Sequence, residues 1–398
     1  MKKSRILELD ILRAIAFIFI VIQHTIGVYS NSKMANFTDI LILKFIYEIS
    51  KIGVPIFITL TGMVLFYRYY DDFNLVDFYK KRIKYIFIPY TIWCIPFLII
   101  KNSPLTFKYI TMEILSGNSW THLWYMGMVL RIYLYFPLII FFTRKLLKCS
   151  KTIKVIFLVL YFIFYWWVLK NNNIISENIG IWIFKNPTKF QQKFINVTPV
   201  FWSIYFVIGI YIIFVYEQFK KIIWKHRKLL STIYTITLVY SYYTSIKDKI
   251  GDPIPFIRFN HALHIFCCII SILFFYLIAL YISNFKNKLY RFLKFTAEYS
   301  FPAYILHVFI VAVIIIPEVC LIDHPRYSNF ISFVVNTLNH TWSTPKHCLL
   351  LFSIILCILT VVITPCICYL ISFLPFSKYI LGIKPKCKFI NICESVKK

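Results

Sequence analysis

Long apolar stretches, separated by short polar and basic segments, dominate this chain of 398 residues. Ten of these stretches approach the roughly 20 residues that a helix needs to cross a bilayer. Lipid offers the backbone no hydrogen-bond partners, so spanning segments must be helices or barrel strands, and these stretches are too long and too uniformly apolar for strands. The predicted spans are 9–29, 52–68, 84–101, 123–143, 153–169, 197–216, 229–246, 261–283, 299–316 and 349–374. The pattern therefore predicts an all-α fold, a polytopic bundle of about ten transmembrane helices in the lipid bilayer.

Three stretches make the number of helices less certain than the fold class. The predicted spans 153–169 and 229–246 are short, so the count could change by one or two helices. The segment 37–51 is apolar enough to lie in the membrane interface or to re-enter the bilayer. None of these alternatives changes the prediction of a helical membrane protein.

The composition agrees with a membrane location. Hydrophobic residues make up 60% of the chain and charged residues 15%, whereas soluble domains carry about a quarter charged residues. The formal net charge is +28, and the Lys and Arg side chains sit in short clusters between the apolar stretches. This distribution follows the positive-inside rule of membrane proteins. Nucleic acid is not expected as a partner, because the chain offers no soluble domain that could read a groove.

The basic residues also predict an orientation. With the N-terminus in the cytoplasm, the inner segments hold 28 Lys and Arg and the outer segments hold 14. Basic residues of short loops accumulate on the cytoplasmic side. We therefore expect a multi-pass protein of the cell membrane with both termini in the cytoplasm.

The first span contains ionisable residues that are costly in lipid. Asp10 and Arg13 are three positions apart, close enough on a helix to form an ion pair. His24 follows Arg13 by eleven residues, about three turns, so both side chains should point to the same side of the helix. Ionisable groups at membrane depth usually face the bundle interior and serve a function. An alternative is that Arg13 reaches the cytoplasmic interface while His24 satisfies a neighbouring carbonyl.

Other ionisable residues lie in or near later spans. His122 stands at the outer end of the fourth span, where an interfacial role is the simpler interpretation, whereas His307 lies in the middle of the ninth. Glu298 is expected at the start of the ninth helix, where the helix dipole favours an acid. Arg131 lies a little over two turns into the fourth span, and the sequence identifies no partner for it.

A basic cluster containing Lys81, Arg82 and Lys84 precedes the third span. Membrane topology alone can explain it. Alternatively, these side chains bind the phosphates of a nucleotide-like donor. The eleven Cys show no metal-ligand spacing, so no metal site and no permanently bound cofactor are expected.

Taken together, these residues resemble the acyltransferase 3 family of integral membrane O-acyltransferases. The first-helix signature of that family, an Arg and a His separated by ten residues after Leu-Asp, occurs here as Leu9-Asp10-Ile11-Leu12-Arg13 through His24. The Gly53–Gly62 run, the basic cluster, His122-Leu123-Trp124-Tyr125, Gly209 and the Ser300–His307 segment follow in family order. One departure is Lys84, which lies one position earlier than the last basic residue of the family's basic motif.

The resemblance implies an acyltransferase domain over residues 1–376, followed by a basic cytoplasmic tail at 377–398. It implies acyl transfer from cytoplasmic acyl-CoA, such as acetyl-CoA or succinyl-CoA, to a hydroxyl of a cell-surface glycan. His24 would be the general base, with Asp10, His122, His307 and Glu298 as further catalytic candidates. The donor would bind to Arg13, Lys81, Arg82 and Lys84.

Two alternatives remain. A polysaccharide exporter would use the same bundle without acyl-transfer chemistry, and a structural partner of a glycan synthase complex would need no site at all. The exporter is disfavoured because the two halves of the chain lack the paired Gly/Pro-broken helices that transporters often contain.

Overall fold

The computed structural model describes residues 4–30, 36–247, 262–319 and 349–386 of the chain. Within these ranges the regular structure is helical and contains no strand, which confirms the all-α membrane bundle. Eight helical segments are long and apolar enough to cross a membrane. They are Leu7–Tyr29, Phe37–Tyr69, Leu75–Ile100, Thr121–Lys148, Lys151–Lys170, Gln191–Phe214, Leu263–Asn284 and Leu349–Ile371.

Two predicted spans are helical but are not among these eight. The stretch 229–246 lies in α13 (Arg227–Lys247), whose many Ser, Thr and Tyr residues reduce its mean hydropathy. The stretch 299–316 lies in α15 (Lys288–Val319), which begins eleven residues earlier than expected, at a basic segment. The total of about ten spans therefore stays a prediction.

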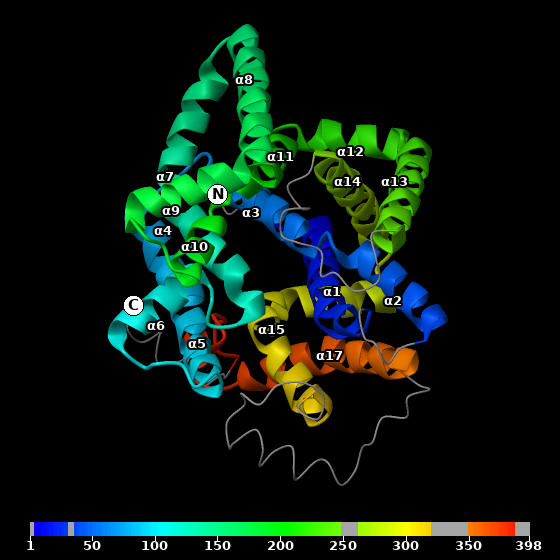
Figure 1. Cartoon of the computed structure of the whole chain (residues 1–398). Coiled ribbons are helices and arrows are strands. Elements are labelled where there is room, and N and C mark those ends of the chain that lie inside the picture. The colour runs from blue at the N-terminus through cyan, green and yellow to red at the C-terminus, as the bar shows by residue number, and fades with distance from the viewer. Residues whose placement is uncertain (1–3, 31–35, 248–261, 320–348, 387–398) are drawn as a thin grey trace, which may run out of the picture.

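Helix α1 (Leu7–Tyr29) occupies the centre of the bundle. It packs against α2 (Phe37–Ser50), α3 (Gly53–Tyr69), α14 (Ala262–Asn284), α15 and α17 (Leu349–Ile371), as Figure 1 shows. Most of its side chains are buried, including the ionisable Glu8 and Asp10. The helix that carries the most unusual polar residues is thus the helix most enclosed by protein.

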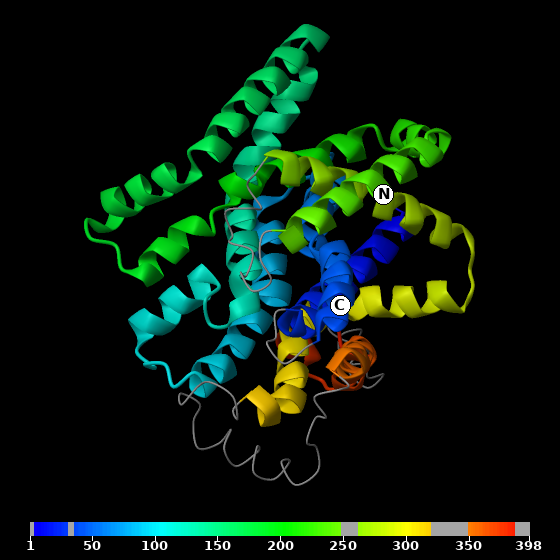
Figure 2. The same cartoon turned by 45° about the vertical axis from the view of Figure 1, so that its right-hand side comes forward.

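The middle of the chain forms a more open part of the bundle. Helices α7 (Trp124–Lys148) and α8 (Lys151–Lys170) form a hairpin that extends away from the other helices in both cartoon views (Figures 1 and 2). Many large apolar side chains of α8 are exposed, as expected for a helix that faces hydrocarbon. The chain continues through α9 (Asn172–Phe184), α10 (Lys189–Asn196), the 3-10 turn η3 (Pro199–Trp202), α11 (Ser203–Phe214) and α12 (Tyr216–Lys225).

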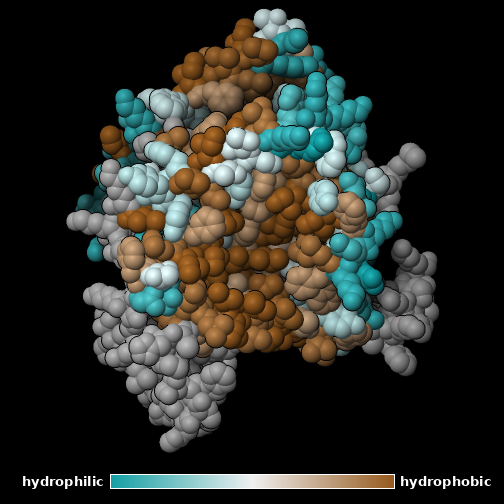
Figure 3. Space-filling view, turned by 90° about the vertical axis from the view of Figure 1, so that its right-hand side faces the viewer, coloured by the Kyte–Doolittle hydropathy of each residue, from teal (hydrophilic) through white to brown (hydrophobic). Residues whose placement is uncertain are grey.

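The surface has the apolar zone that a bilayer requires. Figure 3 shows a broad hydrophobic area in the centre of one face, with hydrophilic residues gathered mainly along its upper and right-hand edges. In water such an area would be costly, whereas hydrocarbon solvates it. Together with the eight apolar helices, this surface makes the chain a multi-pass membrane protein.

At two places in the bundle the backbone departs from a regular α-helix. Between α4 (Leu75–Arg82) and α5 (Ile88–Ile100), residues Ile83–Phe87 form the π-helical turn η1. Pro89 follows it and has no N–H to donate to the carbonyl of Tyr85, four residues earlier. Gly382, at a φ of 68°, packs against that carbonyl, and a Cβ there would lie 2.1 Å from the Tyr85 oxygen. The second irregularity is the 3-10 turn η2 (Thr121–Leu123), between α6 (Phe107–Ser116) and α7.

Only the first ten residues of the predicted tail are among the described residues. Residues 377–386, which include α18 (Ser377–Ile380), pack onto the bundle: Trp93 Nε1 donates to the carbonyl of Ile380 at 2.9 Å, and the Lys386 N–H donates to Ser372 at 2.9 Å. The rest of the predicted tail, residues 387–398, lies outside the described residues.

Helices α3 and α11 cross at very short distance because each has a glycine at the crossing. A Cβ at Gly209 would lie 2.1 Å from the Thr59 oxygen, and one at Gly62 would lie 2.4 Å from the Phe206 oxygen. Small residues that allow backbones to approach are a common means of helix association in membranes.

Gly209→Ala should therefore destabilise the protein, because backbone atoms cannot move aside as a side chain can. The expected loss is about 1–3 kcal/mol, the usual cost of overpacking. The control is Gly180→Ala, whose new Cβ would meet only side-chain atoms of Gln192 and Pro187. Thermal unfolding in detergent should give a lower midpoint for the first variant than for the second. Equal midpoints would contradict the close α3–α11 contact.

Candidate functional site

Three histidines from distant parts of the chain meet inside the bundle. His24 comes from α1, His122 from η2 and His307 from α15. The ring centroids are 5.3 Å apart for His24 and His307, 5.1 Å for His122 and His307, and 5.9 Å for His24 and His122. His122 and His307 are fully buried, whereas His24 is partly exposed. Two of the further catalytic candidates, His122 and His307, thus lie beside His24.

Hydrogen bonds to main-chain carbonyls orient two of the rings. His122 Nε2 donates to Ile305 at 3.2 Å, and His307 Nδ1 donates to Tyr304 at 2.7 Å. A carbonyl oxygen only accepts, so these nitrogens carry the protons of the neutral rings. The other nitrogens, His122 Nδ1 and His307 Nε2, are buried and have no hydrogen-bond partner among the described residues. Each of these two nitrogens has a lone pair that can accept a proton or a hydrogen bond from a substrate.

Tyr304 connects the elements that hold the histidines. Its hydroxyl donates to the main-chain carbonyl of His122, and its own carbonyl accepts from His307. Its ring centroid lies 5.5 Å from that of His122 and 5.9 Å from that of His307. No sequence pattern singled out Tyr304 as a functional residue. The signal available in the sequence was its position one helical turn before His307.

A cavity of about 320 Å³ adjoins the histidine cluster (His24, His122 and His307) through Tyr304. Arg13 and Arg82 both line it, together with polar side chains of Thr61, Tyr125 and Ser300. The guanidinium groups therefore face the same space although they come from different helices. A cavity that combines two cations with apolar walls suits a ligand that is anionic at one end and extended at the other.

Asp10 holds Arg13 rather than lining the cavity. Its carboxylate accepts from Arg13 at 3.4 Å and pairs also with Arg5. The predicted Asp10–Arg13 pair is therefore present, and the buried acid is compensated by two cations.

The basic cluster before the third span is divided between two environments. Arg82 points into the cavity region, with its guanidinium 4.9 Å from the ring centroid of Tyr133. Lys81 pairs with Asp77, and Lys84 lies over the ring of Tyr85 at 5.5 Å. Neither lysine lines the cavity. Arg82 therefore lines the same cavity as Arg13, whereas Lys81 and Lys84 lie outside its lining.

Glu298 lies in the interior of α15 and not at its start, because the helix begins at Lys288; the helix-dipole interpretation is therefore wrong. Its carboxylate accepts from Lys386 Nζ at 2.9 Å in a partly exposed ion pair. His307 is nine residues further along, a rise of about 14 Å in an α-helix. Glu298 is thus an anchor for the segment after α17 and is not brought to the histidines.

Arg131, for which the sequence identified no partner, binds main-chain carbonyls. Its guanidinium donates to Phe194 at 2.7 Å and to Leu115 at 3.4 Å. Carbonyls that are free to accept cannot be recognised from sequence. Among the described residues, no group of three or more His, Cys, Asp or Glu side chains is arranged to hold a metal ion.

Comparisons with known proteins give a family and a set of relatives. The model of a family described as "Acyltransferase domain" matches residues 6–372. Proteins of Staphylococcus aureus strains MSSA476 and N315, each named "Probable poly-beta-1,6-N-acetyl-D-glucosamine export protein", are 25% identical over 315 residues. The alignments cover 77% of this chain and 82% of each relative. No solved structure matches the chain.

Tyr304→Phe should destabilise the protein by about 1–3 kcal/mol, because the buried carbonyl of His122 would lose its donor. Tyr205→Phe is the matched control, since the buried Tyr205 hydroxyl faces the thiol of Cys268, a weak hydrogen-bond partner, and bonds to no carbonyl among the described residues. Chemical unfolding of both variants in the same detergent measures the difference. If Tyr205→Phe is the more damaging change, Tyr304 does not fix the turn that carries His122.

Proposed function

The chain belongs to the acyltransferase family, and we propose that it moves an acetyl or succinyl group from acyl-CoA to a hydroxyl of an extracytoplasmic polysaccharide. It is a membrane enzyme that transfers groups other than aminoacyl groups. The observation that carries the specific proposal is the meeting of His24, His122 and His307 beside a cavity that contains Arg13 and Arg82.

The donor would bind with its phosphates at Arg13 and Arg82. Guanidinium groups form strong, charge-assisted hydrogen bonds with phosphate oxygens. The narrow pantetheine arm of coenzyme A is suited to the 320 Å³ cavity and would run past Tyr125 toward Tyr304. The thioester would then reach the histidine cluster, which adjoins Tyr304. Lys81 and Lys84 would contribute long-range attraction rather than direct contacts.

The proposed reaction is a direct transfer in which His24 is the general base. His24 removes the proton from the sugar hydroxyl as its oxygen attacks the thioester carbonyl carbon. The tetrahedral intermediate collapses with cleavage of the carbon–sulfur bond, and the thiolate of coenzyme A takes the proton from the imidazolium. An ester and free coenzyme A result. His24 is the partly exposed histidine, which leaves it accessible to an acceptor.

The name of the Staphylococcus aureus relatives favours a second candidate function, export of a polysaccharide. An exporter would use the same bundle but would not need a base. It would need a continuous path wide enough for a chain of sugars. The 320 Å³ cavity, with Tyr125 and Tyr304 in its wall, is not such a path. A glycan synthase complex would be the partner for either function.

His24→Ala should reduce transfer of radiolabelled acetyl or succinyl groups from acyl-CoA in membranes by about 10²–10⁴-fold, the usual contribution of a positioned base. His226→Ala, at an exposed position, is the control for loss of an imidazole elsewhere. Glycan at the cell surface is measured in the same cells. If acylation stays intact while glycan at the surface is lost, the exporter proposal replaces the enzyme proposal.

Arg82→Gln should weaken use of the donor more than Lys81→Gln does, although the two residues are adjacent. Arg82 lines the cavity, whereas Lys81 is paired with Asp77 at the surface. The expected effect is a rise in KM for acyl-CoA without a change in acceptor preference. Steady-state kinetics over a range of donor concentrations provide the measurement. Equal effects of the two substitutions would place the phosphates outside the cavity.

Both termini are expected in the cytoplasm, since basic residues are twice as numerous in the proposed inner segments. A reporter that is active only in the cytoplasm should work when fused after Lys398. A reporter active only outside should fail at the same position. The opposite result would reverse the side from which the donor enters.

A further inference from the structure

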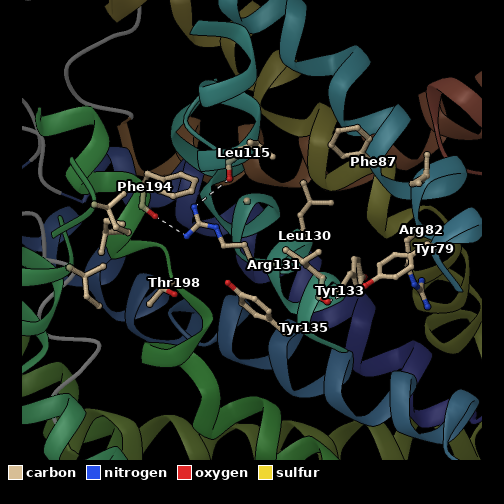
Figure 4. A pocket seen from close by; sticks show the side chains of 16 residues that line it. Tyr79, Arg82, Phe87, Leu115, Leu130, Arg131, Tyr133, Tyr135, Phe194 and Thr198 are labelled. Carbon is tan, nitrogen blue, oxygen red and sulfur yellow. Dashed lines mark hydrogen bonds between the residues drawn. The ribbon is translucent and has the colours of Figure 1, made fainter. Parts of the chain in front are cut away.

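A second cavity, of about 540 Å³, lies outside the proposed catalytic site. Its walls come from α4, η1, α6, α7, α9 and α10, and Figure 4 shows it with Arg131 and Arg82 on opposite sides of Leu130 and Tyr133. Its volume is within the range of about 300–1,000 Å³ that is common for ligand sites. Its lining is mainly apolar and aromatic, so a hydrocarbon group would be well accommodated.

This cavity opens to the surface that faces lipid. Six of its lining side chains are among the exposed large apolar residues, and the most exposed are Leu134 at 61%, Ile83 at 50% and Ile183 at 49%. In a membrane protein, apolar side chains with this exposure contact hydrocarbon. Bilayer lipid is therefore next to the opening at very high concentration, and a lipid chain can enter without crossing water.

The charges in the lining favour an anion. Arg82 and Arg131 are its charged residues, and the lining contains no carboxylate. Arg131 already donates to two main-chain carbonyls and stacks on the Phe194 ring at 4.0 Å, so it stabilises the wall between α7 and α10. Arg82 is less satisfied: its guanidinium rests on aromatic rings and donates one long hydrogen bond, at 3.5 Å, to the Tyr69 hydroxyl, while its Nε is buried without a hydrogen-bond partner among the described residues. A phosphate at Arg82 would supply the missing acceptors.

We propose that this cavity binds one hydrocarbon chain of a phospholipid with an anionic head group, whose phosphate lies at Arg82. The proposal goes beyond acyl transfer and does not depend on it. Arg82 and Tyr133 also line the 320 Å³ cavity, so the lipid phosphate and the donor phosphates would compete for the Arg82 guanidinium. A net negative head group is favoured over a zwitterionic one because no acid in the lining could pair with a choline or ethanolamine cation.

Retention of lipid by the full-length protein tests this proposal. The protein is reconstituted with equal amounts of phosphatidylglycerol and phosphatidylcholine and repurified in detergent, and the retained lipids are quantified by mass spectrometry. Phosphatidylglycerol should exceed phosphatidylcholine by at least about fivefold, the ratio expected for roughly 1 kcal/mol per basic residue. Equal retention of the two lipids would overturn the proposal.

Substitutions in opposite walls locate the site. Leu134→Trp on α7 and Ile183→Trp on α9 should each fill the cavity and remove most of the retained phosphatidylglycerol. Leu138→Trp is the control, because Leu138 is on α7 with 60% exposure but does not line the cavity. Each variant must elute as a monodisperse peak, and the two walls provide independent tests. Retention in both wall variants equal to that in Leu138→Trp would refute this location.

Two further measurements test whether the anionic head group is bound at Arg82. Arg82→Gln should bring retention of phosphatidylglycerol down to that of phosphatidylcholine, whereas Lys81→Gln should leave the preference intact. Millimolar inorganic phosphate should not displace the lipid, because the chain contributes much of the binding. Displacement by phosphate would identify a simple phosphate site and would overturn the assignment to a lipid.

Discussion

The cost of an ionisable side chain in hydrocarbon is the constraint on which this structure depends. Helix α1 carries Asp10, Arg13 and His24 at membrane depth, and each must find its partners inside the protein. The bundle meets this requirement by enclosing α1 with five other helices. Asp10 receives two cations, and His24 joins two other imidazoles. The central position of α1 follows from its chemistry, since a helix with these residues cannot face lipid.

The backbone around the cavity departs from regular helix where function would need it to. The π-turn at Ile83–Phe87 begins directly after Arg82, and π-turns often occur at functional sites. The 3-10 turn at Thr121–Leu123 carries His122 into the bundle just before α7 begins. The close contact of Gly209 with α3 shows the opposite case, in which regular helices approach until their backbones touch.

The sequence predicted the helical membrane fold and most of the spans because hydrophobic length depends on local composition. It could not decide whether α13 spans the membrane, because the hydropathy of this helix is low. It also could not locate the start of α15, because that helix continues into a basic segment. Among the candidate residues, His24 and His307 could be proposed from their cost in lipid and His122 from the family resemblance, but the meeting of the three side chains depends on the tertiary structure. Arg82 and Lys81 are neighbours with opposite surroundings, and a cluster of like charges gives no sign of which one faces inward.

The distribution of polar atoms favours chemistry over passage of a polymer. A conduit for sugars must offer many exchangeable hydrogen bonds along its length, so that no single position binds too strongly. Here the two imidazole nitrogens His122 Nδ1 and His307 Nε2 are buried without a hydrogen-bond partner among the described residues, and the cations of the 320 Å³ cavity are Arg13 and Arg82. Tyr304 lies between these two regions: its hydroxyl donates to the main-chain carbonyl of His122, and its own carbonyl accepts from His307 Nδ1. Separating an anion-binding end from a proton-accepting end is what a donor with phosphates at one end and a thioester at the other would require.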